Sequence, residues 1–204
     1  MTLGLIDINS GNIKSLESAI NKLNIRYKKC VKPEDFIGTS KLILPGVGAF
    51  PDFMKRLEER NLIEVIIQKS NENVPFLGIC AGYQVLFAES KEHKLTKGLN
   101  LISGSFLHFN EYNKDIKVPH VGWNNCKFLK KSPLFADIKD NTDFYFDHSF
   151  YLNSKSRDCF VTSTEYHTDF ISSINHKNIY GVQFHPEKSQ DNGIKCLKNF
   201  YENC

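Results

Sequence analysis

Short apolar runs alternate with amphipathic stretches in the first half of the chain. Residues 3–8 are apolar without clean alternation, which is typical of a strand buried on both faces of a parallel sheet. Apolar residues then recur at helical spacing over residues 13–23, and a second buried run covers residues 41–44. This order predicts an α/β fold with a central, mostly parallel sheet and helices on both faces.

The second half of the chain reads differently. Apolar and aromatic residues fall in short alternating runs over residues 100–109, 118–128, 143–146, 159–163, 170–175 and 179–184, which predicts extra antiparallel strands. Residues 89–97 are polar and charged, so we expect a solvated loop or a frayed helix there, without chemistry. The last residues share an apolar helical face, and nothing divides the chain, so we expect one domain over residues 1–204.

Composition excludes several classes of function. A hydrophobic content of 41% with 24% charged residues is ordinary for a globular protein, and no apolar run reaches the ~20 residues that a membrane span needs. The net charge of +3 is too small to indicate nucleic-acid binding. The six cysteines lack C-x-x-C spacing, which argues against a metal site and a disulfide framework. We expect a cytoplasmic protein without membrane, metal or cofactor.

The first candidate for chemistry is Cys80. A short apolar run enters a turn in which Gly78 and Gly82 flank the cysteine, and a further apolar segment at helical spacing follows. A sharp turn between a strand and a helix exposes a nucleophile, and the start of a helix stabilises a thiolate. The alternative is a buried structural cysteine.

The second candidate is His185, which ends a predicted strand because Pro186 cannot continue the ladder. Glu187 follows two residues after the histidine. An imidazole that takes the thiol proton and a carboxylate that orients the ring complete a Cys/His/acid arrangement. The alternative is a structural histidine, but the two segments together favour catalysis.

Residues 44–48 supply a third element. The run Leu-Pro-Gly-Val-Gly ends a buried strand, and Gly46 and Gly48 permit a backbone that turns N–H groups toward a developing negative charge. Acyl transfer needs such an oxyanion hole. The alternative is a plain turn between a strand and a helix.

Four separated segments resemble signatures of the class I (triad) glutamine amidotransferases. They are LPGVGAF at residues 44–50, GICAGYQ at 78–84, VPHVGWN with HSF at 118–124 and 148–150, and QFHPE at 183–187. The third is most similar to glutaminase subunits of imidazole glycerol phosphate synthase. Four motifs in one order are a strong signal, whereas one alone is weak.

The resemblance implies a flavodoxin-like fold and a role for each matching residue. Asn12 is also a candidate helix cap, and Trp123 a candidate core residue. The implied roles are catalysis for Cys80, His185 and Glu187; the oxyanion hole for Gly46, Val47 and Ala81; substrate binding for Gly48, Gln84, His148, Ser149 and Phe150; and the partner interface for Asn12, Trp123 and Lys188.

The implied reaction is hydrolysis of L-glutamine to glutamate and ammonia through a Cys80 thioester. A glutaminase uses all four motifs, so we expect the ammonia to pass to a second protein. By resemblance this is a (β/α)8-barrel cyclase that forms a heterodimer with the chain in histidine biosynthesis. Hydrolysis by the isolated chain should then be low until the partner is liganded.

Other functions remain open at this point. Ala81, Tyr83, Asp147 and Phe150 stand where the family commonly has Leu, Met, Val and Tyr. These differences raise the alternative of a paralogue that supplies ammonia to a sugar amidotransferase in surface-polysaccharide (LPS) synthesis. Further alternatives are a stand-alone cysteine hydrolase of γ-glutamyl bonds and a non-catalytic protein that only regulates its partner.

Overall fold

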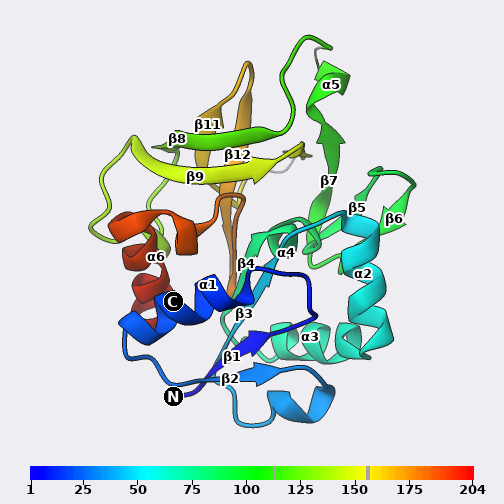
Figure 1. Cartoon of the computed structure of the whole chain (residues 1–204). Helices are drawn as coiled ribbons and strands as arrows, with labels where there is room; N and C mark the ends of the chain where they lie inside the picture. Colours follow the sequence, from blue (N-terminus) through cyan, green and yellow to red (C-terminus); the bar gives the residue numbers. More distant parts are fainter. Residues whose placement is uncertain (113, 155–156) are drawn as a thin grey trace.

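A computed structural model describes residues 1–112, 114–154 and 157–204 (Figure 1). The strands are β1 (Leu3–Ile6), β2 (Tyr27–Cys30), β3 (Lys41–Gly46), β4 (Phe76–Cys80), β5 (Phe87–Ser90), β6 (Thr96–Lys97), β7 (Ile102–His108), β8 (His120–Phe128), β9 (Thr142–His148), β10 (Phe150–Asn153), β11 (Phe160–Glu165), β12 (Asp169–His176) and β13 (Ile179–Val182). The helices are α1 (Ile13–Lys22), α2 (Phe50–Glu59), α3 (Leu62–Asn71), α4 (Ala81–Gln84), α5 (Phe109–Tyr112) and α6 (Gln190–Asn203), with 3-10 turns η1 (Pro33–Phe36), η2 (Pro133–Phe135) and η3 (Pro186–Lys188).

One large sheet organises the described residues. Its nine strands follow the order β2-β1-β3-β4-β13-β12-β11-β8-β9. The pairs from β2 to β13 are parallel, and the pairs from β13 to β9 are antiparallel. The predicted α/β fold class is confirmed, and the extra antiparallel strands extend the parallel half into a mixed sheet.

The strand register brings three distant segments to one edge. Gly46 of β3 pairs with Cys80 of β4, and Val182 of β13 pairs with Ile79 of β4. Because these three strands are parallel, the segments that follow them leave the sheet on the same side. In open α/β sheets the carboxyl ends of the strands are where ligands bind.

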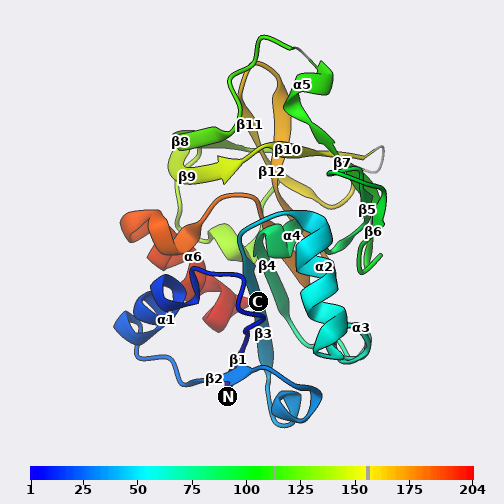
Figure 2. The ribbon, with the colours of Figure 1, turned by 45° about the vertical axis from the view of Figure 1, so that its right-hand side comes forward.

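Helices cover both faces of the parallel half (Figure 2). Helices α1 and α6 pack on one face, and α2 and α3 pack on the other. Strands covered on both faces should be apolar throughout, and β1, β3 and β4 are buried at every position. This double burial fixes the strand ends that carry the candidate chemistry.

The chain after Cys80 departs from the prediction. The expected helix is a single turn, α4, and the apolar residues after it lead into β5. Tyr83, Phe87 and Phe106 pack edge to face with ring centroids 5.4–5.6 Å apart. The apolar residues after Cys80 therefore pack against β7 and do not extend the helix. The loop predicted for residues 89–97 is also wrong in part, because β5 and β6 pair there in a second sheet, β10-β7-β5-β6.

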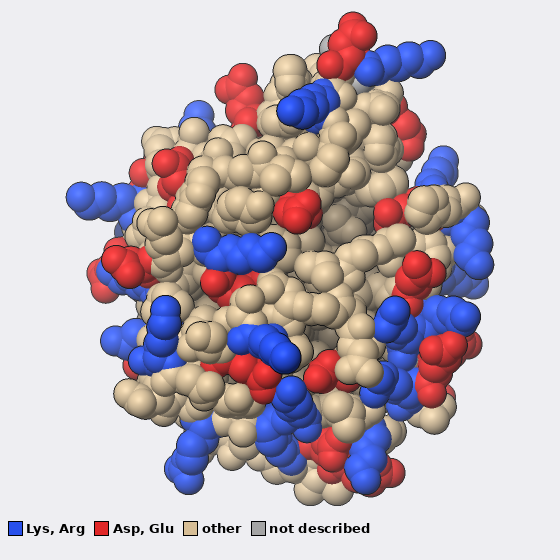
Figure 3. Space-filling view, in the orientation of Figure 1, with Lys and Arg blue, Asp and Glu red and all other residues tan. Residues whose placement is uncertain are grey.

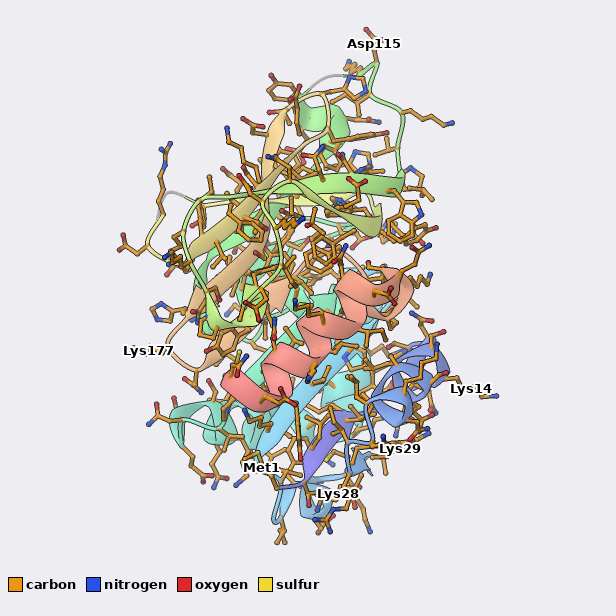
Figure 4. All side chains as sticks on the ribbon, turned by 90° about the vertical axis from the view of Figure 1, so that its left-hand side faces the viewer. Met1, Lys14, Lys28, Lys29, Asp115 and Lys177 are labelled. Atoms are coloured by element: carbon orange, nitrogen blue, oxygen red, sulfur yellow. The ribbon has the colours of Figure 1, made fainter. Side chains whose placement is uncertain are left out.

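The surface carries both signs of charge. Lys and Arg are interspersed with Asp and Glu on the face in Figure 3. Lys28 and Lys29 lie near Met1 on the edge strand β2, at the opposite end of the molecule from Asp115 (Figure 4). Within the described ranges, no helix has both the length and the apolar character that a membrane crossing requires.

Candidate functional site

Cys80 occupies a strained turn between β4 and α4. Its φ of 54° and ψ of −112° are unusual for a residue with a side chain, and such a conformation costs about 1–3 kcal/mol. The turn needs glycine on both sides. A Cβ at Gly82 would lie 1.9 Å from the carbonyl oxygen of Leu44, and one at Gly78 would lie 2.6 Å from that of Gly82.

The thiol is less accessible than the sequence predicted. Cys80 is only 5% exposed, although it lines a cavity of about 320 Å³. This volume lies at the lower end of the range for small-molecule sites, roughly 300–1,000 Å³. The turn therefore presents the nucleophile to the cavity and leaves little of it exposed.

The structure places His185 close to both Glu187 and Cys80. The backbone N–H of His185 donates to the carbonyl of Tyr145 on β9 at 2.8 Å, which fixes the segment against the sheet edge. Its Nδ1 lies 2.8 Å from Glu187 Oε1, and both side chains are almost fully buried. Because a carboxylate only accepts, Nδ1 carries the proton, and Nε2 is the ring nitrogen that remains for the sulfur.

The charge distribution favours an ionised pair. Burial lowers the pKa of His185, but the negative charges of Cys80 and Glu187 outweigh burial and raise that pKa to about 10. No described residue forms an aligned hydrogen bond with Nε2 at rest. Catalytic hydrogen bonds are often loose before substrate binds. The site thus holds an imidazolium close to the sulfur.

Asn12 has a role that the sequence did not predict. Its backbone precedes α1, but its side chain makes no capping hydrogen bond. The amide Nδ2 instead donates to Glu187 Oε1, the same oxygen that binds His185. The predicted helix cap is therefore wrong, and Asn12 orients the carboxylate of the candidate triad.

The cavity collects most of the predicted binding residues. It is lined by Val47, Gly48, Ala49, Cys80, Ala81, Gln84, Glu92, Pro119, Asp147, His148, Ser149 and Phe150. Gly46 is not among them. Its backbone pairs with Cys80, and a Cβ at this position would lie 1.9 Å from the ring of Phe53. Gly46 is therefore needed for close packing beneath the turn. The α4 helix is too short to contribute the predicted helix dipole at full strength.

Glu92 is a site residue that the sequence reading missed. It lies in the charged stretch to which no chemistry was assigned. Its Oε2 accepts a hydrogen bond of 2.7 Å from the backbone N–H of Phe50, the first residue of α2. The hydrogen bond holds the carboxylate at the cavity wall, where it can bind a cationic group. A run of mixed charges carries no signal for this placement.

Two buried histidines form hydrogen bonds within the loop that lines the cavity. His148 Nδ1 lies 2.8 Å from the carbonyl oxygen of Phe150, and its Nε2 lies 3.0 Å from His120 Nδ1. The Asn124 amide lies 3.3 Å from His120 Nε2. Because the carbonyl only accepts, the protons are ordered along this chain with both rings neutral. Burial lowers the pKa of His120 to about 4, and burial with repulsion from His120 lowers that of His148 to about 3.

Trp123 and Lys188 lie outside the cavity. Trp123 is 48% exposed on β8, so the core alternative is wrong. Its ring meets Tyr145 edge on at 6.1 Å, and Lys188 Nζ lies 5.3 Å from the centre of the same Tyr145 ring. Val121, also on β8, is 54% exposed. These residues lie beside the His185 segment, on a surface available to another protein.

One difference from the usual family pattern has no bearing on the cavity. Tyr83 is fully buried, and a Cβ on Gly181 would lie 2.3 Å from its ring. It is therefore a core residue. Ala81, Asp147 and Phe150 do line the cavity. Among residues 1–112, 114–154 and 157–204, no group of three or more His, Cys, Asp or Glu side chains is placed to hold a metal ion.

Comparisons with known proteins show which family the sequence matches. The family model described as glutamine amidotransferase class-I matches residues 5–204. Imidazole glycerol phosphate synthase subunit HisH of Methanocaldococcus jannaschii is 44% identical over 204 residues, which cover 98% of each chain. The HisH subunit of Geobacter metallireducens is 38% identical over 98% of this chain and 97% of its own. HisH 2 of Vibrio vulnificus is 42% identical over 99% and 94%.

Solved structures show the same fold at low sequence identity. A glutamine amidotransferase superposes with a TM-score of 0.76 at 16% identity, covering 98% of this chain and 97% of its own. A chain of PurLQS from Thermotoga maritima gives 0.74 at 16% identity, again covering 98% and 97%.

Proposed function

This chain belongs to the class-I glutamine amidotransferase family, and we propose that it is the glutaminase subunit of an imidazole glycerol phosphate synthase. The observation that carries the proposal is that His185 pairs with Glu187 and lies close to Cys80, which lines the cavity. Relatives that bear this name match the chain over nearly its full length. The proposed substrate is L-glutamine, and we treat residues 1–204 as one domain.

The proposed reaction begins with the Cys80 thiolate. Its sulfur attacks the side-chain amide carbon of glutamine and forms a tetrahedral intermediate, whose oxyanion is stabilised by backbone amides near Val47 and Ala81. His185 then gives its Nε2 proton to the leaving nitrogen, so the C–N bond breaks, ammonia departs and a glutamyl thioester remains. Glu187 holds the ring throughout.

Water completes the cycle. His185, now neutral, takes a proton from a water molecule that attacks the thioester carbon. The C–S bond breaks, glutamate leaves, and the thiolate and imidazolium are restored. Glutamine and water thus give glutamate and ammonia. Glu92 and the carbonyl oxygen of Gln84 can bind the α-ammonium group of the substrate from the cavity wall.

The ammonia requires an acceptor protein. We propose a (β/α)8-barrel cyclase that binds as a heterodimer in the cytoplasm. Exposed Trp123 and Val121, with Lys188 beside them, support a docking surface next to the catalytic segment. Burial of two large apolar side chains on binding would favour association. Because Tyr83 is a core residue, it gives no support to the sugar amidotransferase alternative.

Glutamate release tests the proposal. The purified chain is assayed alone, with the barrel cyclase, and with the cyclase and its nucleotide ligand. We expect low activity alone and strong stimulation by the liganded cyclase. Cys80→Ala should abolish hydrolysis with the fold intact, whereas Cys204→Ala, at a thiol remote from the cavity, should retain it. High activity in the isolated wild type would contradict a gated enzyme, and activity in Cys80→Ala would refute the assigned nucleophile.

A further inference from the structure

Gln183 is a buried polar residue that has no role in the mechanism proposed above. It follows β13 directly, and the parallel register of Val182 with Ile79 places it beside Cys80. Its side chain is 1% exposed. The amide Nε2 lies 3.7 Å from Cys80 Sγ, and Oε1 accepts a hydrogen bond of 3.1 Å from Gln84 Nε2.

The two hydrogen bonds give each amide a direction. Gln183 accepts from Gln84 through its carbonyl oxygen and turns its NH2 group toward the sulfur. Gln84 donates its NH2 group to Gln183. The carbonyl oxygen of Gln84 is therefore left to face the cavity that Gln84 lines. One buried amide therefore connects the nucleophile to a residue of the substrate cavity.

The sulfur has a second polar neighbour with the opposite preference. The carbonyl oxygen of Asp147 lies 3.7 Å from Cys80 Sγ. A carbonyl can only accept, so it favours the protonated thiol, whereas the N–H of Gln183 favours the thiolate. Gln183 and Asp147 therefore place a donor and an acceptor against the same sulfur.

We propose that Gln183 is a further catalytic residue of the glutaminase reaction, an inference that rests on the function proposed above. Its N–H donates to the Cys80 thiolate and keeps the nucleophile ionised. Its carbonyl end turns Gln84 so that an oxygen acceptor faces the substrate ammonium group. A merely structural Gln183 would affect stability, but it would change neither the ionisation of Cys80 nor the affinity for glutamine.

Alkylation of Cys80 tests the first role without any need for turnover. Iodoacetamide labelling is followed against pH by mass spectrometry of the Cys80 peptide in the full chain, with Cys80→Ala as background. A hydrogen bond to a charged group corresponds to a shift of about one pH unit. We expect Gln183→Met to move the labelling midpoint upward by about this amount, and the isosteric Gln183→Glu to move it further. Gln68→Met, at an exposed glutamine on α3, should leave it unchanged.

Steady-state kinetics with the liganded cyclase test the second role. Gln183→Met should raise KM for glutamine and lower kcat, each by about tenfold, whereas Gln84→Met should raise KM alone. Gln183→Glu keeps the side-chain shape, so it serves if the methionine variant fails to fold. Wild-type labelling midpoints in both Gln183 variants would overturn the inference even when the wild type hydrolyses glutamine. If the wild type hydrolyses no glutamine, the proposed function fails, and a wild-type midpoint in both variants would still refute the hydrogen bond.

Discussion

The buried pair of His120 and His148 should make the protein sensitive to acid. Both rings are neutral in the folded state, with pKa values of about 4 and about 3, against about 6.5 in an unfolded chain. The unfolded state therefore binds more protons than the folded state over this range. Stability rises with pH in that situation. The free energy of unfolding keeps its full value above about pH 6.5 and decreases as the pH falls toward 4.

The magnitude follows from the shifts. At pH 5 the pH lies about 1.5 units below the pKa of each unfolded imidazole. Protonation therefore stabilises the unfolded state by about 2 kcal/mol for each histidine. The pair therefore costs about 4 kcal/mol of unfolding free energy between pH 8 and pH 5. That is a large part of the roughly 5–15 kcal/mol typical of a folded domain.

A non-titrating variant isolates the effect. His120→Gln retains a donor for His148 and an acceptor for Asn124, but it does not take up a proton. Urea unfolding at pH 8, 7, 6 and 5 gives the loss of stability for each protein. We expect the loss from pH 8 to pH 5 to be about 2 kcal/mol smaller in the variant. Comparing losses within each protein removes any constant packing cost.

A matched control uses His176→Gln, because His176 is exposed at the end of β12. Its stability should follow the wild-type curve with pH. Parallel curves for the wild type and His120→Gln between pH 8 and pH 5 would refute the view that His120 is held neutral. The chain of hydrogen bonds from Asn124 through His120 to His148 would then need a different assignment of protons.

Three further predictions concern the site and the turn. Gly82→Ala should cost about 3 kcal/mol or more in urea unfolding, since its Cβ would collide with the carbonyl of Leu44; stability equal to the wild type would contradict a tight turn. Glu92→Gln should raise KM for glutamine about tenfold in the cyclase-activated assay, with kcat little changed; an unchanged KM would remove Glu92 from the substrate site. Asn12→Ala should lower kcat about tenfold at constant KM, because Glu187 loses a donor; unchanged kcat would make this contact dispensable.

The parts of the site that follow from local backbone sterics could be predicted from the sequence. Glycines around Cys80 and a proline after His185 indicate a tight turn and a strand end from local sterics alone. Parallel strands then bring such ends to one edge of the sheet. The proximity of Cys80 and His185 across more than a hundred residues follows from topology, because the register of β4 with β13 places the two strand ends side by side.

The contacts that the sequence did not predict depend on long-range geometry. Glu92 belongs to an ordinary run of charges, and only the return of the chain through β5 places it at the N-terminus of α2. Asn12 has the residue type of a helix cap, yet a buried carboxylate competes for its amide. Val85 and Leu86 repeat at helical spacing, but the core shared with β7 ends the helix after one turn. In each case tertiary packing overrides a correct local preference.

The three histidines near the cavity show how one site separates charge. His185 stays cationic because Cys80 and Glu187 supply negative charge at close range, despite its burial. His148 receives no such compensation, and the positive charge of His185 further lowers the pKa of His148. A cation on His148 would oppose the imidazolium that protonates the leaving ammonia. The neutral His120–His148 pair instead donates a hydrogen bond to the Phe150 carbonyl and holds the loop that lines the cavity, without adding a competing charge. Histidines in different environments therefore take different roles.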